Sequence, residues 1–189
     1  MSKLQELMQK LCPDGVEYRR LGDKDVSIMQ RGTSLTKNNS KEGIYPVISG
    51  GRIPAFYCDK FNREGETITV AGSGAGYVQY WNEPIFVCDA FSIKGCKEVS
   101  TKYLYYCLTN LQDKIYATKK GGGVPHVHIS SIENFLIPIP HIDIQEEIVN
   151  ILDRFAELQA ELQAELQARQ EQYEYYRNKL LSFQEITKA

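Results

Sequence analysis

Apolar residues recur at helical spacing from Gln145 to Phe183, in a stretch without glycine or proline. The steps between them alternate between three and four residues, which is the heptad pattern of a coiled coil. At 1.5 Å per residue such a helix is roughly 58 Å long, more than a small domain can cover. Its apolar stripe therefore requires a second long helix, from another copy of the chain or from a different protein. The predicted contact positions are Ile148, Ile151, Phe155, Leu158, Leu162, Leu166, Tyr173, Tyr176 and Leu180.

Three consecutive Ala-Glu-Leu-Gln tetrapeptides, which begin at Ala156, Ala160 and Ala164, place one additional step of four in this pattern. A four-residue insertion is a stutter, which locally unwinds a supercoil without losing its seam. Near the start of the stretch, Asp143 as N-cap with Glu146 three residues later predicts a capping box. The pattern thus predicts one continuous helix with a defined beginning.

Residues 1–140 show a different pattern, in which short apolar runs are separated by polar and glycine-rich loops. Thr67–Ala71 and Tyr77–Trp81 flank a glycine-rich loop and predict a hairpin. A helix is predicted from Ser100 to Ile115. Further strands are predicted at residues 16–21, 26–29, 44–48, 53–57, 85–93 and 136–140, and a short amphipathic helix at 1–11. The chain is therefore predicted to be α+β, with a mostly β globular domain (1–140) followed by one long helix (141–189).

The formal charge of −2 is unevenly distributed along the chain. Residues 1–140 carry 17 Lys and Arg against 14 Asp and Glu, a charge of +3, and residues 141–189 carry 5 against 10, a charge of −5. A domain of +3 is compatible with nucleic acid but does not demand it. The five cysteines include no CxxC pair, and neither a signal peptide nor an apolar run long enough for a bilayer is evident. These features predict a cytoplasmic protein without a membrane partner.

The loop Gly72-Ser-Gly-Ala-Gly76 offers free backbone amides. A dinucleotide-binding fingerprint requires a helix directly after the loop, whereas Tyr77–Trp81 alternates like a strand. Two interpretations stay open: a plain hairpin loop, or a loop that approaches a ligand or the DNA backbone. The histidines and cysteines lack the spacing of zinc ligands, and no nucleophile signature surrounds any cysteine. We therefore predict no metal site, no bound cofactor and no catalytic residue in this chain.

Three loops around Arg31, Arg52 and Lys119–Lys120 combine basic or hydroxyl side chains with glycines. Arginine can bind guanine with two hydrogen bonds, and lysine, serine, threonine and free amides can hold phosphates. For any single loop a solvated surface segment is the simpler interpretation, and only convergence in space favours binding. The candidate DNA-binding residues are Arg31, Thr33, Ser34, Lys37, Ser49, Arg52, Ser73, Lys119, Lys120, Gly122, His126 and His128.

Several segments together resemble one known family, the specificity subunit of type I restriction–modification systems. They are Leu-Cys-Pro-Asp-Gly-Val-Glu-Tyr-Arg-Arg-Leu-Gly at 11–22, Gly-Gly-Gly-Val-Pro-His at 121–126, Ile-Pro-Ile-Pro at 137–140 followed by Gln-Glu-Glu-Ile-Val-Asn-Ile-Leu-Asp at 145–153, and the tetrapeptide repeats with Gln-Tyr-Glu-Tyr-Tyr-Arg-Asn-Lys-Leu-Leu at 172–181. The resemblance covers nearly the whole chain and is strongest at the junction of the Ile-Pro-Ile-Pro segment with the helix.

The resemblance implies a target recognition domain that reads one half of a split sequence in double-stranded DNA. In that family two such domains alternate with two helices, which lie antiparallel and set the distance between the domains. The helices also dock methyltransferase subunits, which use S-adenosylmethionine to methylate adenine. A restriction subunit, a translocase and endonuclease, completes the complex, so ATP and Mg²⁺ are implied for partner subunits and not for this chain.

With one domain and one helix, the chain resembles a half-length subunit. Such a chain would form a homodimer through its helix, in an antiparallel coiled coil, and a two-fold dimer reads a split palindromic site. A natural half subunit and the first half of a longer subunit both fit this pattern. The competing hypothesis is a coiled-coil adaptor that recruits other proteins and binds no DNA. An enzyme with an unrecognised site ranks last.

Overall fold

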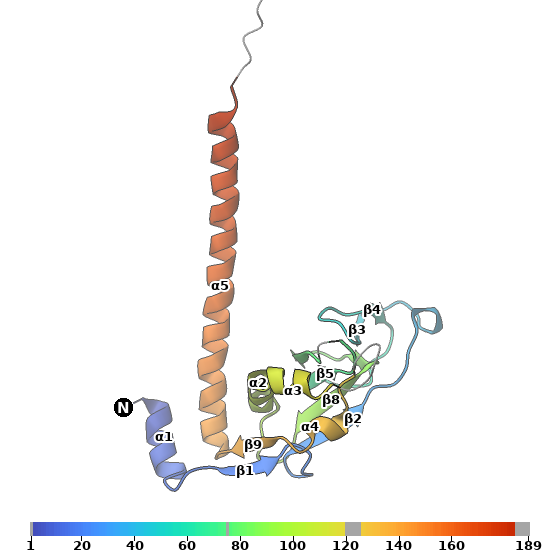
Figure 1. Ribbon diagram of the computed structural model, residues 1–189, viewed down its shortest axis with the longest axis vertical. Coiled ribbons are helices and arrows are strands. Elements are labelled where there is room, and N and C mark those ends of the chain that lie inside the picture. The colour runs from blue at the N-terminus through green and yellow to red at the C-terminus, as the bar shows by residue number, and fades with distance from the viewer. Residues whose placement is uncertain (1, 75, 120–125, 184–189) are drawn as a thin grey trace, which may run out of the picture. The chain divides into compact units, whose positions relative to one another are not determined.

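The structure is a computed structural model that describes residues 2–74, 76–119 and 126–183. It divides into two compact units, residues 1–149 and 150–189, which are considered separately. The predicted α+β class is confirmed: the first unit is mostly β, and a long helix follows (Figure 1). Among the described residues, none of the helices is both long enough and apolar enough to cross a membrane.

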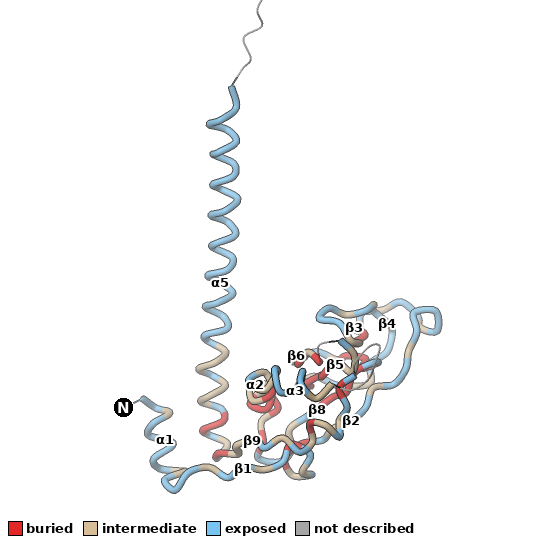
Figure 2. The backbone as a smooth tube through the Cα atoms, viewed as in Figure 1, coloured by how far each residue is buried: buried red, intermediate tan, exposed pale blue. Residues whose placement is uncertain are grey.

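The main sheet of the first unit has the strand order β2-β8-β5-β6. Its strands are β2 (Ser27–Arg31), β8 (Ala90–Gly95), β5 (Thr67–Ala71) and β6 (Val78–Trp81). The predicted hairpin is confirmed, because β5 and β6 pair antiparallel with Ile68 opposite Tyr80. Helix α2 (Thr101–Asn110) packs Leu104 and Leu108 against Ile68 and Ile93, all of them fully buried, as Figure 2 shows for the region of β5, β8 and α2.

Two smaller sheets complete the strands of the first unit. One has the order β4-β3-β7, formed by β4 (Phe56–Cys58), β3 (Tyr45–Ile48) and β7 (Phe86–Val87). The other pairs β1 (Glu17–Arg20) with β9 (Leu136–Ile139), which places the Ile-Pro-Ile-Pro segment beside the start of the domain. The prolines are tolerated because β9 is an edge strand. The remaining short elements are α1 (Lys3–Leu11), the 3-10 helix η1 (Lys37–Asn39), α3 (Gln112–Ala117) and α4 (Ile129–Ile132).

Two predicted elements are wrong in detail. The strand expected at residues 85–93 is two strands, β7 and β8, in different sheets and separated by Cys88 and Asp89. The helix expected from Ser100 to Ile115 is also two, because α2 ends at Asn110 and α3 begins at Gln112. Ser100 caps α2 as expected, since its hydroxyl accepts a hydrogen bond from the Tyr103 amide.

Helix α5 spans Ile142–Leu181, and its first turn belongs to the first unit. The predicted N-cap at Asp143 is wrong, because the helix begins one residue before it. The His141 carbonyl accepts from the Ile144 and Gln145 amides, and His141 Nδ1 accepts from the Asp143 amide at 3.3 Å. A histidine ring thus takes the place that an Asp or Ser oxygen usually has at this position.

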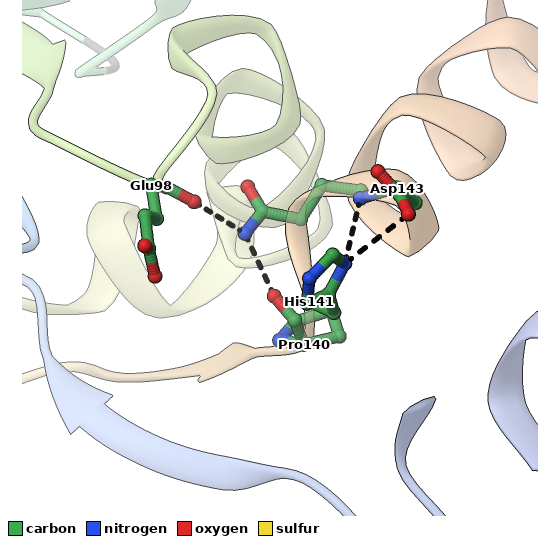
Figure 3. Close-up of polar contacts among 5 residues, drawn as sticks. Glu98, Pro140, His141 and Asp143 are labelled. Carbon is green, nitrogen blue, oxygen red and sulfur yellow. Dashed lines mark hydrogen bonds and ion pairs between the residues drawn. The ribbon is translucent and has the colours of Figure 1, made fainter. Parts of the chain in front are cut away.

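Gln145 is fully buried in that first turn. Its side-chain amide donates to the carbonyls of Glu98 (2.9 Å) and Pro140 (2.8 Å), as Figure 3 shows. Its side-chain oxygen accepts from the Ser100 amide at 2.9 Å. One side chain therefore joins the end of β9, the start of α2 and the start of α5. A separate ion pair between Lys3 and Glu147, at 2.5 Å, attaches α1 to the same part of α5.

The part of α5 in the second unit has no core. From residue 154 to residue 183 every residue is exposed (Figure 2). The exposed large apolar side chains there include Phe155, Leu158, Leu162 and Leu166, with exposed fractions of 58–67%. They are members of the predicted contact stripe, and none of the residues that the structure describes covers them.

Candidate nucleic-acid interface

The break between β7 and β8 creates the first part of the site. Asp89 lies in this break and is exposed, and Arg31 lies nearby at the end of β2, where it pairs with Phe91 of β8. Gly32 follows, and its amide donates to the Ala90 carbonyl at 2.9 Å. A Cβ atom at Gly32 would lie 2.1 Å from the Cys88 carbonyl oxygen, so only glycine lets the chain pass here. Backbone packing thus fixes Arg31 next to the β7–β8 break.

The glycine loop after β5 meets two distant segments. Ser73 forms an isolated antiparallel bridge with His126, and its hydroxyl donates to Asp89 Oδ2 at 3.0 Å. His126 Nδ1 lies 3.1 Å from the Gly72 carbonyl oxygen. Because a carbonyl only accepts, Nδ1 carries the hydrogen, which leaves Nε2 of a neutral ring as an acceptor. The interpretation of this loop as a plain hairpin connection is therefore incomplete, since it anchors both Asp89 and His126.

The loop at residues 49–52 packs onto the same place. A Cβ atom at Gly50 would lie 2.0 Å from Ser73 Oγ, so this glycine allows the two loops to touch. Gln79 donates from its side-chain amide to the Arg52 carbonyl at 2.7 Å. The Arg52 guanidinium carbon lies 4.3 Å from the centroid of the Tyr77 ring, a cation–π contact that holds an otherwise mobile side chain.

An open cavity of about 230 Å³ lies between the end of β2, the β7–β8 break, Gly72 and residues 126–129. Its charged and titratable lining side chains are Arg31, Cys88, Asp89, His126 and His128, and Gly32 and Gly72 leave the backbone accessible. Among the described residues neither Arg31 nor Asp89 has an ion-pair partner. The cavity therefore presents a guanidinium, a carboxylate and two imidazoles. Asp89 and His126 each make one internal hydrogen bond, which leaves Asp89 Oδ1 and His126 Nε2 for a ligand.

Arg63 supports the C-terminal end of β2, where Arg31 lies. Its guanidinium donates to the Arg31 carbonyl at 2.8 Å, to the Ser92 hydroxyl at 2.6 Å and to the Asn62 carbonyl at 2.6 Å. Partial burial lowers the pKa of this guanidinium, although it stays charged at neutral pH. Three neutral acceptors hold Arg63 in place, so it acts as a support for the strand end that carries Arg31.

The structure brings together some of the predicted DNA-binding residues and separates others. Arg31, His126 and His128 line the cavity. Ser73 binds Asp89 and His126 there, and the loop that contains Ser49 and Arg52 packs on Ser73. The Thr33 amide donates to the Val87 carbonyl, so the segment with Thr33 and Ser34 runs alongside the end of β7. Lys37 lines a different hollow beside β4, and Lys119 Nζ lies 3.5 Å from the centroid of the Tyr116 ring. Lys120 and Gly122 lie outside the described residues.

Residues at the site that were not predicted include Asp89, Tyr77, Gln79 and the supporting Arg63. Asp89 interrupts an apolar run from Ile85 to Ile93, and this interruption is the signal that could have found it. Tyr77 and Gln79 act through contacts with Arg52, 25 and 27 positions earlier in the sequence, and no local pattern indicates such contacts. No group of three or more His, Cys, Asp or Glu side chains with metal-binding geometry occurs among the residues that the structure describes.

The family model for the type I restriction modification DNA specificity domain matches residues 13–171. The chain belongs to this family. The match covers the sheets, the candidate interface and most of α5, and confirms the resemblance noted in the sequence. Relatives are named as specificity subunits, so the expectation of a specificity component rather than an enzyme is also confirmed.

Members of this DNA specificity family align with most of the chain. A provisionally assigned type I specificity subunit of Mycoplasma pneumoniae is 28% identical over an alignment of 193 positions. The alignment covers 95% of this chain and 62% of that protein. A provisionally assigned type I restriction enzyme specificity subunit of Haemophilus influenzae is 30% identical and covers 92% of this chain and 48% of that protein. The chain thus spans about half to three fifths of the length of these relatives.

Solved structures agree with the architecture. A type I restriction–modification S subunit of M. genitalium superposes with a TM-score of 0.69 at 24% identity, covering 88% of this chain and 46% of that chain. An HsdS subunit of Thermoanaerobacter tengcongensis superposes with a TM-score of 0.62 at 18% identity, covering 85% and 44%. At these identities the similarity establishes the specificity-subunit fold, in agreement with the α+β prediction.

Proposed function

We propose that the chain is the DNA-reading subunit of a type I restriction–modification complex, in which residues 1–140 contact one half of a split site in double-stranded DNA. The observation that carries this proposal is that sequence-distant segments meet at one place. Arg31, Asp89 and His126 line one cavity, Ser73 binds both Asp89 and His126, and the loop that contains Arg52 packs on Ser73. Donors and acceptors that keep free hydrogen-bonding capacity, on loops held by backbone packing, suit base edges and phosphates.

The exposed stripe on α5 supports the second part of the proposal, a homodimer. Leu158, Leu162 and Leu166 are 58–67% exposed along a helix with coiled-coil spacing, and burying such a stripe favours association. Two copies joined antiparallel would present two recognition domains related by a two-fold axis. Such a dimer reads a split palindrome, with one half-site for each domain.

Family membership supports two kinds of protein partner, methyltransferase subunits and a restriction subunit, with this chain as the specificity component. Methyltransferase subunits would dock on the dimerised helices and supply S-adenosylmethionine, and a restriction subunit would supply ATP- and Mg²⁺-dependent translocation and cleavage. The chain itself would bind none of these cofactors. Such a complex acts on chromosomal or invading DNA, and we expect it in the cytoplasm.

A genome-wide map of methylated adenine tests the proposal, in cells that express this chain with the methyltransferase subunit of its own system. A split palindromic motif is the expected result. A split asymmetric motif would contradict the homodimer, because a second, different recognition domain would then take part. Associated, soluble subunits without any motif would contradict DNA reading and favour the adaptor, whose complex would also lack salt-sensitive DNA affinity.

The tetrapeptide repeats allow a second test of the same dimer. Each Ala-Glu-Leu-Gln repeat contributes roughly 6 Å of helix, so repeat number is expected to set the spacing between half-sites. Deletion of residues 160–163 removes one repeat and keeps the flanking pattern. We expect an intact dimer whose methylation motif has a changed spacer and unchanged half-sites. An unchanged spacer would contradict the role of the helix as a ruler.

A further inference from the structure

We infer that Asp89 and Arg31 read one C·G base pair in each half-site, with the Asp89 carboxylate accepting from the cytosine amino group and Arg31 donating to the paired guanine. This inference rests on the proposed function and deepens it, because it names the base pair and the two residues that select it. Neither the family match nor the similar proteins assign a role to these positions.

The charge of Asp89 excludes a phosphate contact at this point of the cavity. A carboxylate repels phosphate oxygens, and a site built only to hold the DNA backbone places Lys or Arg there. Asp89 is nevertheless exposed and lines the cavity together with Arg31 and His126. On the surface of double-stranded DNA, the groups that a carboxylate can accept from are amino groups on base edges. In the major groove these are cytosine N4 and adenine N6.

Asp89 is held in place for this role. The Ser73 hydroxyl donates to Oδ2 at 3.0 Å, which fixes the carboxylate and leaves Oδ1 free to accept. Ser73 is itself confined, because the Gly50 backbone lies so close that a Cβ atom there would reach 2.0 Å from Ser73 Oγ. The carboxylate is therefore oriented before any DNA arrives, and preorganisation of this kind favours selectivity over adaptability.

Arg31 decides between cytosine and adenine. A guanidinium donates two hydrogen bonds to guanine O6 and N7, and the cytosine paired with that guanine presents N4–H beside them. The major-groove edge of an A·T pair is different. Its two acceptors, adenine N7 and thymine O4, lie on either side of the adenine amino group, and the thymine methyl group follows. A donor and a carboxylate that line one cavity without pairing to each other match the acceptor–acceptor–donor edge of G·C. The Arg63 contact with the Arg31 carbonyl holds that strand end at the cavity.

The test uses the full chain in complex with the methyltransferase subunit of its system, on duplexes that carry the mapped motif. Each cytosine in turn is replaced by N4-methylcytosine, whose methyl group occupies the major-groove position of the amino hydrogen and preserves pairing. We expect one cytosine per half-site at which this change weakens wild-type binding by roughly 10-fold or more. With Asp89→Ala the same change at that cytosine should have no further effect. The guanine paired with it should likewise become insensitive to 7-deaza substitution with Arg31→Ala.

Two further variants separate a reading role from a folding role. Ser73→Ala keeps the carboxylate but releases it, so the discrimination at the same cytosine should fall partially. Asp59→Asn removes an exposed carboxylate outside the cavity and should leave every position unchanged. The wild-type profile alone is informative if Asp89→Ala fails to fold. A wild-type motif without a cytosine that is sensitive to N4-methylation would overturn this inference and leave the proposed function standing. The absence of any wild-type motif would overturn the proposed function itself.

Discussion

The globular unit and the long part of α5 both have periodic apolar residues, but they bury them differently. In the first unit Ile68, Ile93 and Leu104 have no exposed surface, because strands and helix of the same chain cover one another. In the second unit Leu162 and Leu166 are 67% and 58% exposed. Periodicity therefore predicts an element and its apolar face equally well in both regions. Periodicity does not predict which element buries that apolar face. The face is buried within the chain only where other strands or helices of the same chain pack against it.

Polar side chains show the same difference. In the first unit they are fixed by distant backbone groups, as Gln145 is by the carbonyls of Glu98 and Pro140. On the long helix they make local contacts, such as Arg169 with Glu165 at 3.5 Å across one turn. Exposed pairs of this kind contribute little to stability. The surface of the long helix is thus available to a partner helix, whereas the polar side chains of the domain hold the domain's own segments in place.

The largest expected effect comes from a charge in the exposed stripe. Leu162→Glu would place two carboxylates in the seam of a dimer, and we expect the dimer dissociation constant to rise about 1,000-fold. The globular domain should stay folded, because Leu162 is not one of the residues that form its core. Analytical ultracentrifugation measures the dissociation constant, and circular dichroism follows the strands.

The matched control is Ala164→Glu. It adds the same charge two residues later, about 200° around the helix from Leu162, and should leave the dimer intact. Equal weakening by both variants would mean that overall charge, and not the stripe, governs association. An unchanged dimer with Leu162→Glu would contradict the assignment of this seam.

Shortening a leucine side chain to alanine should affect the free energy of unfolding differently in the two regions. Leu104→Ala removes a fully buried side chain between α2 and the sheet, and we expect the free energy of unfolding of the domain to fall by about 3 kcal/mol. Because the domain supplies its own cover, this loss should be the same at every protein concentration. Leu166→Ala should change the same quantity by less than about 0.5 kcal/mol at concentrations where the chain is monomeric. Urea unfolding at several concentrations measures both.

The sequence predicts well the features that depend on neighbours within a few residues. The β5–β6 hairpin follows from alternation on either side of a glycine loop, and α5 follows from its apolar spacing. The start of α5 was placed wrongly at Asp143 because the helix uses the ring of His141, a residue seldom found as a cap. Local rules describe common solutions, and this chain uses a rare one.

The candidate site required the three-dimensional structure. The strand predicted at residues 85–93 hid the break that exposes Asp89, since the residues around it are apolar enough for one continuous strand. The contacts of Ser73 with Asp89 and with His126 join positions 16 and 53 residues apart. The sequence offers basic and hydroxyl residues as candidates, but only long-range pairing shows which of them share a cavity.

A smaller effect is expected at Gln145, the one buried polar residue of α5. Gln145→Leu keeps the approximate volume but leaves the Ser100 amide and two carbonyls without their partner. We expect the free energy of unfolding to fall by about 2 kcal/mol, because buried groups that lose a hydrogen bond keep their desolvation cost. Amide hydrogen exchange should accelerate in the first turn of α5 and at the start of α2.

Glu146→Leu introduces the same side chain at the adjacent exposed position and is the matched control. Its effect should stay within about 0.5 kcal/mol. Gln145→Glu retains the acceptor for Ser100 but cannot donate to the carbonyls, so it should be destabilising as well. A stability equal to or above that of the wild type with Gln145→Leu would show that the network serves no role in holding this junction.

The smallest effect is a loss of stability at alkaline pH that belongs to the globular unit. Burial raises the pKa of the Tyr103 hydroxyl, which donates to the Pro138 carbonyl at 2.9 Å, and burial also raises the pKa of the Cys107 thiol. Both groups are therefore neutral in the folded chain at pH values where they ionise in the unfolded chain. Their contribution is fully present below the unfolded pKa values, about 8.5 for Cys and 10 for Tyr. It is lost as the pH rises above these values toward the folded ones.

Between pH 8 and pH 10 we expect the free energy of unfolding to fall by about 1 kcal/mol, since an unmatched proton contributes at most about 1.4 kcal/mol per pH unit. Urea unfolding of the wild type and of a Tyr103→Phe, Cys107→Ala variant over this range measures the slope. The variant should lose most of the pH dependence, although it starts from a lower stability at neutral pH. Tyr173→Phe, at a position that is 64% exposed on α5, should leave the slope as it is in the wild type. A slope that followed Tyr173 would place the alkaline sensitivity in the helix and contradict the contrast between an internally closed domain and an open helix.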